Sequence, residues 1–108
     1  MVRGRLKFDS PESVAAGQRI RISVEDTSRA GASAETLVQK EVTIPENFDT
    51  GLDNLPFEID LDENRDGLTL RAHMPRHDGE DIRSGDMITT ASVPVRPDDD
   101  VDVTLRRI

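Results

Sequence analysis

Hydrophobic and polar residues alternate along most of this chain, and this alternation predicts β-strands rather than helices. The pattern is clearest over Leu55–Met74, where apolar residues occupy every second position on both sides of the polar segment 63–67. That segment ends in Asp66 and Gly67, and an Asp-Gly turn between two alternating runs is typical of a β-hairpin. We therefore expect the two halves of this stretch to pair with each other.

Five further alternating runs complete a set of about seven short strands; they cover residues 2–8, 20–24, 36–44, 82–95 and 101–105. Short strands separated by turn residues, with no helix longer than about one turn, predict an all-β fold. The fold we expect is an antiparallel β-sandwich in a single domain over 1–108, and a small barrel is the alternative. The apolar parity predicts burial of Leu6, Ile20, Ile22, Val24, Val38, Phe57, Ile59, Leu70, Val103 and Leu105.

Two strands carry positions that depart from a simple pattern. In the third strand, Lys40 shares its parity with Val38 and Val42, so either its side chain extends to solvent or a bulge resets the register. The strand within 82–95 ends at Pro94, and proline in a sheet is tolerated at an edge. An open edge can accept an extended peptide or can be protected and inert. The candidate partner-binding residues there are Met87, Thr89, Thr90 and Ser92.

Composition narrows the class of protein. Leu, Ile, Val and Phe total 27 of 108 residues, above the roughly 20% below which disorder is expected, so the chain should fold, as a monomer at low concentration. The net charge is −8, which disfavours nucleic-acid binding. The absence of Cys excludes disulfides, thiolate nucleophiles and Cys-ligated zinc, and no apolar run approaches the length of a membrane span.

The segment 62–67 matches the first half of a calcium loop, because oxygen-bearing side chains alternate before a glycine. Its candidate metal ligands are Asp62, Asn64 and Asp66, and Asp60 could add an oxygen. The bidentate Glu expected at loop position twelve is replaced by His73. A hairpin turn with solvated carboxylates is therefore the favoured interpretation, and we expect no cofactor apart from this calcium possibility.

Other candidate chemistry is sparse. His73 falls on the polar face of its strand, no catalytic motif surrounds it, and a surface or ladder histidine is the simpler interpretation. No Trp or Tyr offers a platform for a sugar ring. Basic residues line one face of the first two strands and would lie side by side if these strands pair; they are Arg3, Arg5, Lys7, Arg19 and Arg21. A solvated ion-pair face with Glu41, Glu58, Asp60 and Asp102 is favoured over a patch for an acidic partner.

Several segments together resemble a known family. They are Gly4-x-Leu6, Ile20-x-Ile22-x-Val24-x-Asp26-Thr27-Ser28-Arg29-Ala30, Pro56-Phe57-Glu58-Ile59, Leu70-Arg71-Ala72-x-Met74, Gly85-Asp86, Thr90-x-x-Val93 and Val103-x-Leu105. This set is similar to the YbaY/YscW-like lipoprotein family, whose members include pilotins of type III secretion. Asp26, Ser28 and Arg29 match the most specific motif, and physically they indicate a turn that ends the second strand.

The resemblance implies a β-sandwich without enzymatic activity that binds another protein of the cell envelope. Pilotin-type members are similar in assisting an outer-membrane secretin. The sequence has no lipobox Cys, so the expected location is the periplasm or envelope if a leader was removed and the cytoplasm otherwise. A calcium- or carbohydrate-binding module of the envelope is the alternative function, and an enzyme is the rival class.

Overall fold

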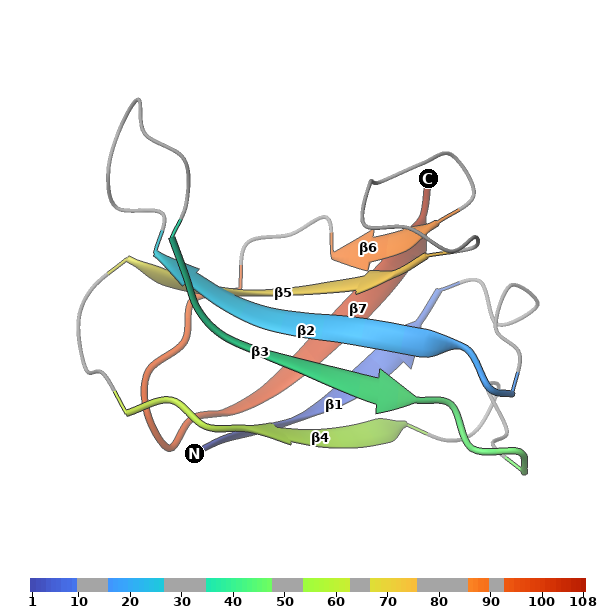
Figure 1. Cartoon of the computed structure of the whole chain (residues 1–108), viewed down its shortest axis with the longest axis horizontal. Coiled ribbons are helices and arrows are strands. Elements are labelled where there is room, and N and C mark those ends of the chain that lie inside the picture. The colour runs from blue at the N-terminus through green and yellow to red at the C-terminus, as the bar shows by residue number, and fades with distance from the viewer. Residues whose placement is uncertain (10–15, 27–34, 48–53, 63–66, 76–85, 90–92) are drawn as a thin grey trace.

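Seven strands form one sheet that curls into a nearly closed, barrel-like shape (Figure 1). The computed structural model describes residues 1–9, 16–26, 35–47, 54–62, 67–75, 86–89 and 93–108. The strands are β1 (Val2–Phe8), β2 (Arg19–Asp26), β3 (Glu35–Thr43), β4 (Leu55–Ile59), β5 (Leu68–Met74), β6 (Met87–Thr89) and β7 (Asp100–Arg107). The described residues contain no helix, which confirms the prediction of an all-β fold.

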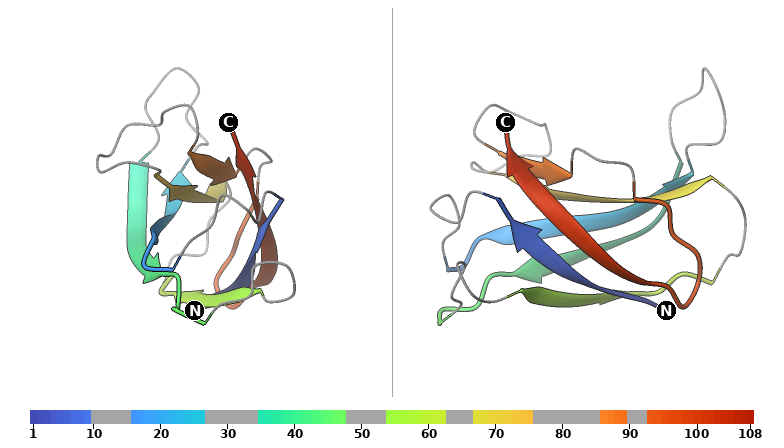
Figure 2. Two further views of the ribbon diagram at one scale, coloured as in Figure 1. Left: turned by 90° about the vertical axis from the view of Figure 1, so that its right-hand side faces the viewer. Right: turned by 180° about the vertical axis from the view of Figure 1, so that it is seen from behind.

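The strand order in the sheet is β3-β2-β5-β6-β7-β1-β4. Every neighbouring pair is antiparallel except β1 and β7, which run parallel. The two outermost strands, β3 and β4, contact each other without a hydrogen-bonded ladder. The predicted antiparallel sandwich is therefore wrong in its finer form, since one mixed sheet surrounds one interior (Figure 2). Alternating strands bury one face in either architecture, so their pattern does not distinguish a sandwich from a barrel.

The predicted hairpin over Leu55–Met74 does not form. Its first half is β4, which pairs with β1, and its second half is β5, which pairs with β2 and β6. The chain instead crosses from one edge of the sheet to its middle between these two strands. Two alternating runs with a turn between them specify two strands but not their partners, because any apolar face can pack into the same interior.

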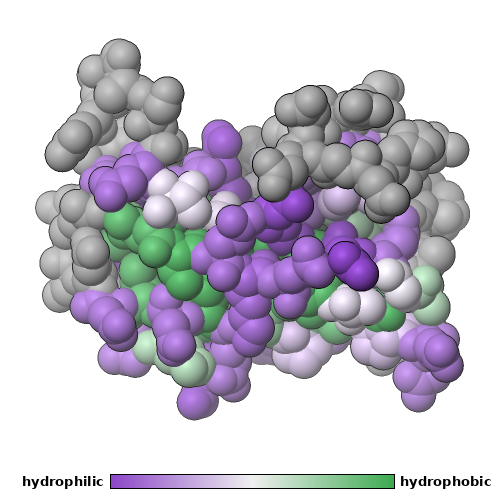
Figure 3. All heavy atoms as spheres, in the orientation of Figure 1, coloured by the Kyte–Doolittle hydropathy of each residue, from purple (hydrophilic) through white to green (hydrophobic). Residues whose placement is uncertain are grey.

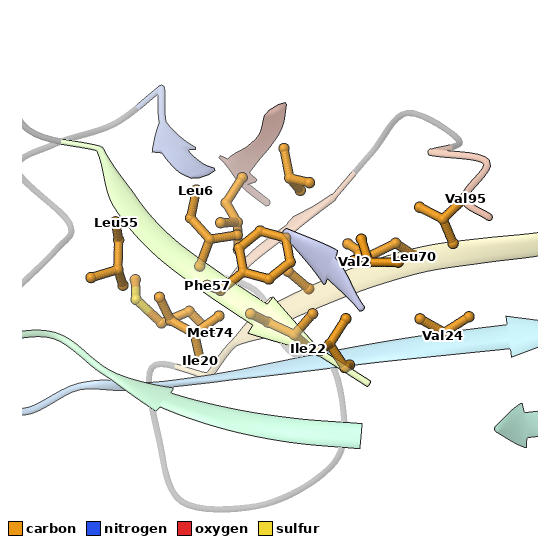
Figure 4. Packing of buried hydrophobic residues seen from close by; sticks show 14 of the residues in the cluster. Val2, Leu6, Ile20, Ile22, Val24, Leu55, Phe57, Leu70, Met74 and Val95 are labelled. Carbon is orange, nitrogen blue, oxygen red and sulfur yellow. The ribbon is translucent and has the colours of Figure 1, made fainter. Parts of the chain in front are cut away.

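The first and last strands, β1 and β7, lie side by side next to the edge strand β4. Gly4 of β1 lies opposite Val101 of β7 on one side and opposite Phe57 of β4 on the other. A Cβ atom at Gly4 would approach the Phe57 ring and the Val101 carbonyl oxygen to 2.5 Å. Glycine is thus required here because the ring of Phe57 occupies the space of a side chain, as the packing around it indicates (Figure 4).

The interior follows the predicted parity closely. Nine of the ten residues that we expected in the core are at most 5% exposed; they are Leu6, Ile20, Ile22, Val24, Phe57, Ile59, Leu70, Val103 and Leu105. The tenth, Val38, is half-buried and packs against the cluster. It lies on an edge strand, which leaves one side of its side chain uncovered.

The position of Lys40 settles the two alternatives for the third strand. A bulge does occur in the β2–β3 ladder, between Val24 and Glu25, but Lys40 lies beyond it and stays opposite Ile22. Lys40 is nevertheless exposed. Because β3 is an edge strand, a long side chain on the inward parity can extend past the edge into solvent.

The strand that we expected at a sheet edge is in the interior of the sheet. Within 82–95 the described strand is β6, and it pairs with β5 on one side and with β7 on the other. Pro94 lies outside the named strands, in a bridge with Thr69 of β5; Leu70 donates to the Val93 carbonyl and Val95 to the Leu68 carbonyl on either side of it. Pro94 therefore does not mark β6 as an edge strand, because it lies five residues after the last residue of β6.

Candidate functional site

A groove crosses the outer face of β3, β2, β5 and β6, where the structure gathers polar and charged side chains (Figure 3). Its cavity volume is about 260 Å³. Ser23 of β2 lies in the middle of this face, opposite Gln39 of β3 and Arg71 of β5. The small serine side chain between long neighbours leaves the hollow, and we call this feature the groove, defined by Arg21, Ser23, Glu25, Gln39, Arg71 and His73.

One end of the groove rests on a buried polar pair. His73 Nε2 and Asp86 Oδ2 are 2.9 Å apart, and the Asp86 side chain is only 2% exposed. A buried carboxylate requires a hydrogen-bonding partner, and the imidazole supplies one. Asp86 immediately precedes β6, so the pair links β5 to the start of β6.

The other end of the groove holds a carboxylate that is only partly satisfied. Glu25 Oε2 is buried without a hydrogen-bond partner, and Arg71 Nε is 3.6 Å away, beyond hydrogen-bond length. Arg21, two residues before Ser23, is half-buried and has no ion pair within the part of the chain that the structure describes. The groove therefore presents a guanidinium group without an ion pair among the described residues and a carboxylate oxygen without a hydrogen bond.

The outer face of β4, β1 and β7 is different, and we call it the ion-paired face. Arg3 pairs with Glu58 at 3.8 Å, and Asp102 lies 3.7 Å from Arg5 and 3.3 Å from Lys7. These side chains are all well exposed. The prediction of a solvated ion-pair face is confirmed for β4, β1 and β7. The basic residues of β1 and β2 do not lie side by side, because these two strands do not pair with each other.

A second feature is the open seam between β3 and β4. Among the described residues, β3 pairs only with β2, and β4 pairs only with β1. The two strands converge where β3 ends and diverge where it begins (Figure 1), and apolar atoms are visible between them in Figure 3. Half-buried apolar residues of β3 border this seam; they are Leu37, Val38 and Val42.

The residues predicted as sites fall in several places. Asp62 is exposed, whereas Asn64 and Asp66 lie outside the described residues, so calcium binding stays a prediction. The described residues hold no cluster of three His, Asp or Glu side chains that could bind a metal. None of them forms a helix long and apolar enough to cross a membrane.

The structure describes only some residues of the candidate partner-binding set and of the motif turn. Met87 is fully buried and Thr89 borders the groove, so neither lies on a free edge. Asp26 is buried at the end of β2. The remaining members, Thr90, Ser92, Ser28 and Arg29, lie outside the described residues.

Sequence reasoning missed the His73–Asp86 pair and the groove. The only signal for the pair was the polar parity of His73, which also suits an exposed residue. Its partner is 13 residues away across an undescribed connection, and no motif spacing links them. In the described residues His73 forms no hydrogen bond with a hydroxyl group, so the pair does not extend to a Ser-His-Asp arrangement.

The fold places the chain in the class of small, barrel-like all-β domains, and comparison with known proteins adds one structural likeness. No protein-family model and no curated protein matches the chain. A solved structure described as an alternative pilotin from the type II secretion system of Vibrio cholerae has a TM-score of 0.70. The match covers 99% of this chain and 95% of that one at 17% identity. At this identity the likeness concerns the fold.

Proposed function

We propose that the chain is a non-catalytic protein-binding domain of the cell envelope, similar in role to a secretion pilotin. The observation that carries this proposal is the likeness of nearly the whole fold to the pilotin of Vibrio cholerae, since both chains are covered almost completely. The resemblance to YbaY/YscW-like lipoproteins in the sequence points in the same direction. If it holds, the partner is an outer-membrane secretin.

The open seam is the place where such a partner would bind. Strand β3 has nine residues without proline and offers backbone groups on its free side, whereas Pro56 removes a donor from β4. An extended segment can add to such an edge by backbone hydrogen bonds. The half-buried Val38 and Val42 would then gain apolar contacts with the added segment. This replaces β6, an interior strand, as the site of strand addition.

The experiment is affinity capture from envelope extract with the chain as bait, followed by identification of the captured protein. Val38→Asp places a charge at the seam, and Thr104→Asp on the exposed face of β7 is the matched control. We expect the control to retain the partner and Val38→Asp to lose most of it. Thermal unfolding of both variants verifies that they fold.

Three results would contradict the proposal or a part of it. Failure of the unmodified chain to retain any envelope protein would remove the protein-binding role. Equal recovery with Val38→Asp and Thr104→Asp would remove the seam as its site. Hydrolysis of an ester, peptide or glycoside substrate by the purified chain would support the enzyme class instead.

A further inference from the structure

The groove contains one charged group without an ion pair among the described residues and one that is paired only at 3.6 Å, without a hydrogen bond. Arg21 is half-buried without an ion pair in the described part of the chain, and Glu25 Oε2 is buried without a hydrogen bond. A buried polar atom without a partner is costly, and most such atoms in folded proteins are satisfied. The two groups lie on the same strand and face the same groove. A ligand with matching groups would satisfy both at once.

The strand register gives the positions of these charges along the groove. Arg21 lies opposite His73, and Arg71 lies opposite Ser23, so both guanidinium groups flank the serine. Glu25 lies two residues further along β2. Successive same-face residues of a strand are about 6.5–7 Å apart. Arg21 and Arg71 thus flank one position at Ser23, the cationic end of this stretch. Glu25, its anionic end, lies one such step along β2, with Arg71 Nε 3.6 Å from its Oε2 in the free chain.

We propose that the groove binds an extended segment of a partner protein in which an acidic residue and a Lys or Arg are separated by one residue. In an extended chain these two side chains point to the same side and have the same spacing as the two ends of the groove. The acidic side chain binds between Arg21 and Arg71, and the basic side chain binds Glu25. The proposal rests on the proposed function, since it names a second contact with the same kind of partner.

Binding exchanges one loose contact for closer ones. Arg71 Nε is 3.6 Å from Glu25 Oε2, so little is lost when Arg71 turns toward the acid of the partner. The movement uncovers Glu25, and the basic side chain of the partner takes the place of Arg71. Each carboxylate then accepts charge-assisted hydrogen bonds, which are shorter and stronger than the present contact.

The size and electrostatics of the groove favour this occupant. Its volume of about 260 Å³ is below the range of about 300–1,000 Å³ for pockets that enclose a drug-sized ligand, and it suits a few side chains. A purely acidic segment would meet Glu25, and a purely basic one would meet Arg21 and Arg71. Only a segment with both charges in this spacing matches both ends.

The test measures binding of two fluorescein-labelled pentapeptides to the full chain by fluorescence polarisation. The first is Gly-Asp-Gly-Lys-Gly, and the second, Gly-Asp-Lys-Gly-Gly, has the same composition but places the charges on opposite sides of an extended chain. We expect the first to bind about tenfold more tightly, which corresponds to roughly one charge-assisted hydrogen bond. Equal affinity of the two peptides, or no binding at millimolar concentration, would overturn the proposal.

Variants assign the effect to the groove. Arg21→Gln and Glu25→Gln should each weaken binding of the first peptide about tenfold, and Arg5→Gln on the ion-paired face should leave it unchanged. Glu25→Lys should prefer Gly-Asp-Gly-Asp-Gly, because both ends of the groove are then cationic. Unchanged binding by Arg21→Gln and Glu25→Gln, or loss with Arg5→Gln, would contradict the assignment.

The peptide test is separate from the capture experiment. If the unmodified chain captures an envelope partner but neither peptide discriminates, the groove proposal fails while the proposed function stands. If the groove binds the first peptide selectively but no protein is captured, the proposed function fails, and the groove is a peptide site without that role.

Discussion

The groove and the ion-paired face are two outer surfaces of the same sheet, built from strands with the same alternation of polar and apolar residues. They differ in burial. On the ion-paired face Arg5 and Asp102 are both more than half exposed, whereas at the groove Glu25 is 17% and His73 14% exposed. Exposed ion pairs contribute about 0–1 kcal/mol, while buried charges must be matched. The same kinds of residue are therefore solvated ion pairs on one face and largely buried, incompletely paired groups on the other.

The largest expected effect comes from the interior beneath the ion-paired face. Phe57→Ala should lower the free energy of unfolding by about 3–5 kcal/mol, because a buried ring between β4 and β1 leaves a cavity. Urea unfolding followed by far-UV circular dichroism measures the change. A decrease in unfolding free energy below about 1 kcal/mol would show that this ring contributes little to the packing of the core.

The buried pair at the groove should have the next largest effect. Asp86→Ala should cost about 3 kcal/mol, because it leaves the His73 ring without its partner and opens a polar hole beside β6. The double variant Asp86→Ala with His73→Ala measures the coupling between the two side chains in the same unfolding experiment. Additive losses in that cycle would mean that the pair does not act as a unit.

Gly4→Ala tests the close approach of three strands. The added methyl group meets both the Phe57 ring and the Val101 carbonyl oxygen, and the backbone oxygen cannot move without shifting β7. We expect a loss of about 2 kcal/mol in unfolding free energy. The combination of Gly4→Ala with Phe57→Ala should be less harmful than the sum, since the shorter side chain frees the space that the methyl group needs.

The smallest effect is expected on the ion-paired face itself. Asp102→Asn removes the acid that Arg5 and Lys7 share, but all three side chains are about half exposed. The unfolding free energy should fall by less than about 1 kcal/mol, and the difference should shrink in molar salt. A loss as large as that of Asp86→Ala would erase the distinction between the two faces.

The sequence predicted the strands and the core because both follow from local alternation. Positions such as Ile22 and Leu105 are buried by parity alone. It did not predict strand partners, since the parallel pairing of β1 with β7 and the separation of β4 from β5 depend on contacts far apart in the chain. The edge position expected for the strand within 82–95 failed at β6 for the same reason.

Little of the candidate site could be predicted. The ion-paired face was expected from the sequence, because charged residues occupy the polar positions of alternating strands. The basic ones lie on β1, and their acidic partners lie on β4 and β7. The groove depends on which strands lie beside β2, and therefore on the strand order that the sequence did not specify. The His73–Asp86 pair joins β5 to the start of β6, and no local signal connects those two positions.

The most direct test of the groove as a binding surface is the map of backbone amide shifts in the ¹⁵N-labelled full chain during titration with Gly-Asp-Gly-Lys-Gly. We expect changes concentrated at the residues of β2 and β5 that line the groove, which are Arg21, Ser23, Glu25, Arg71 and His73. The amides of β1, β4 and β7 should not move, because charges on the ion-paired face are already matched. Changes centred on Arg3, Arg5 and Lys7 instead, or spread evenly over both faces, would contradict this expectation.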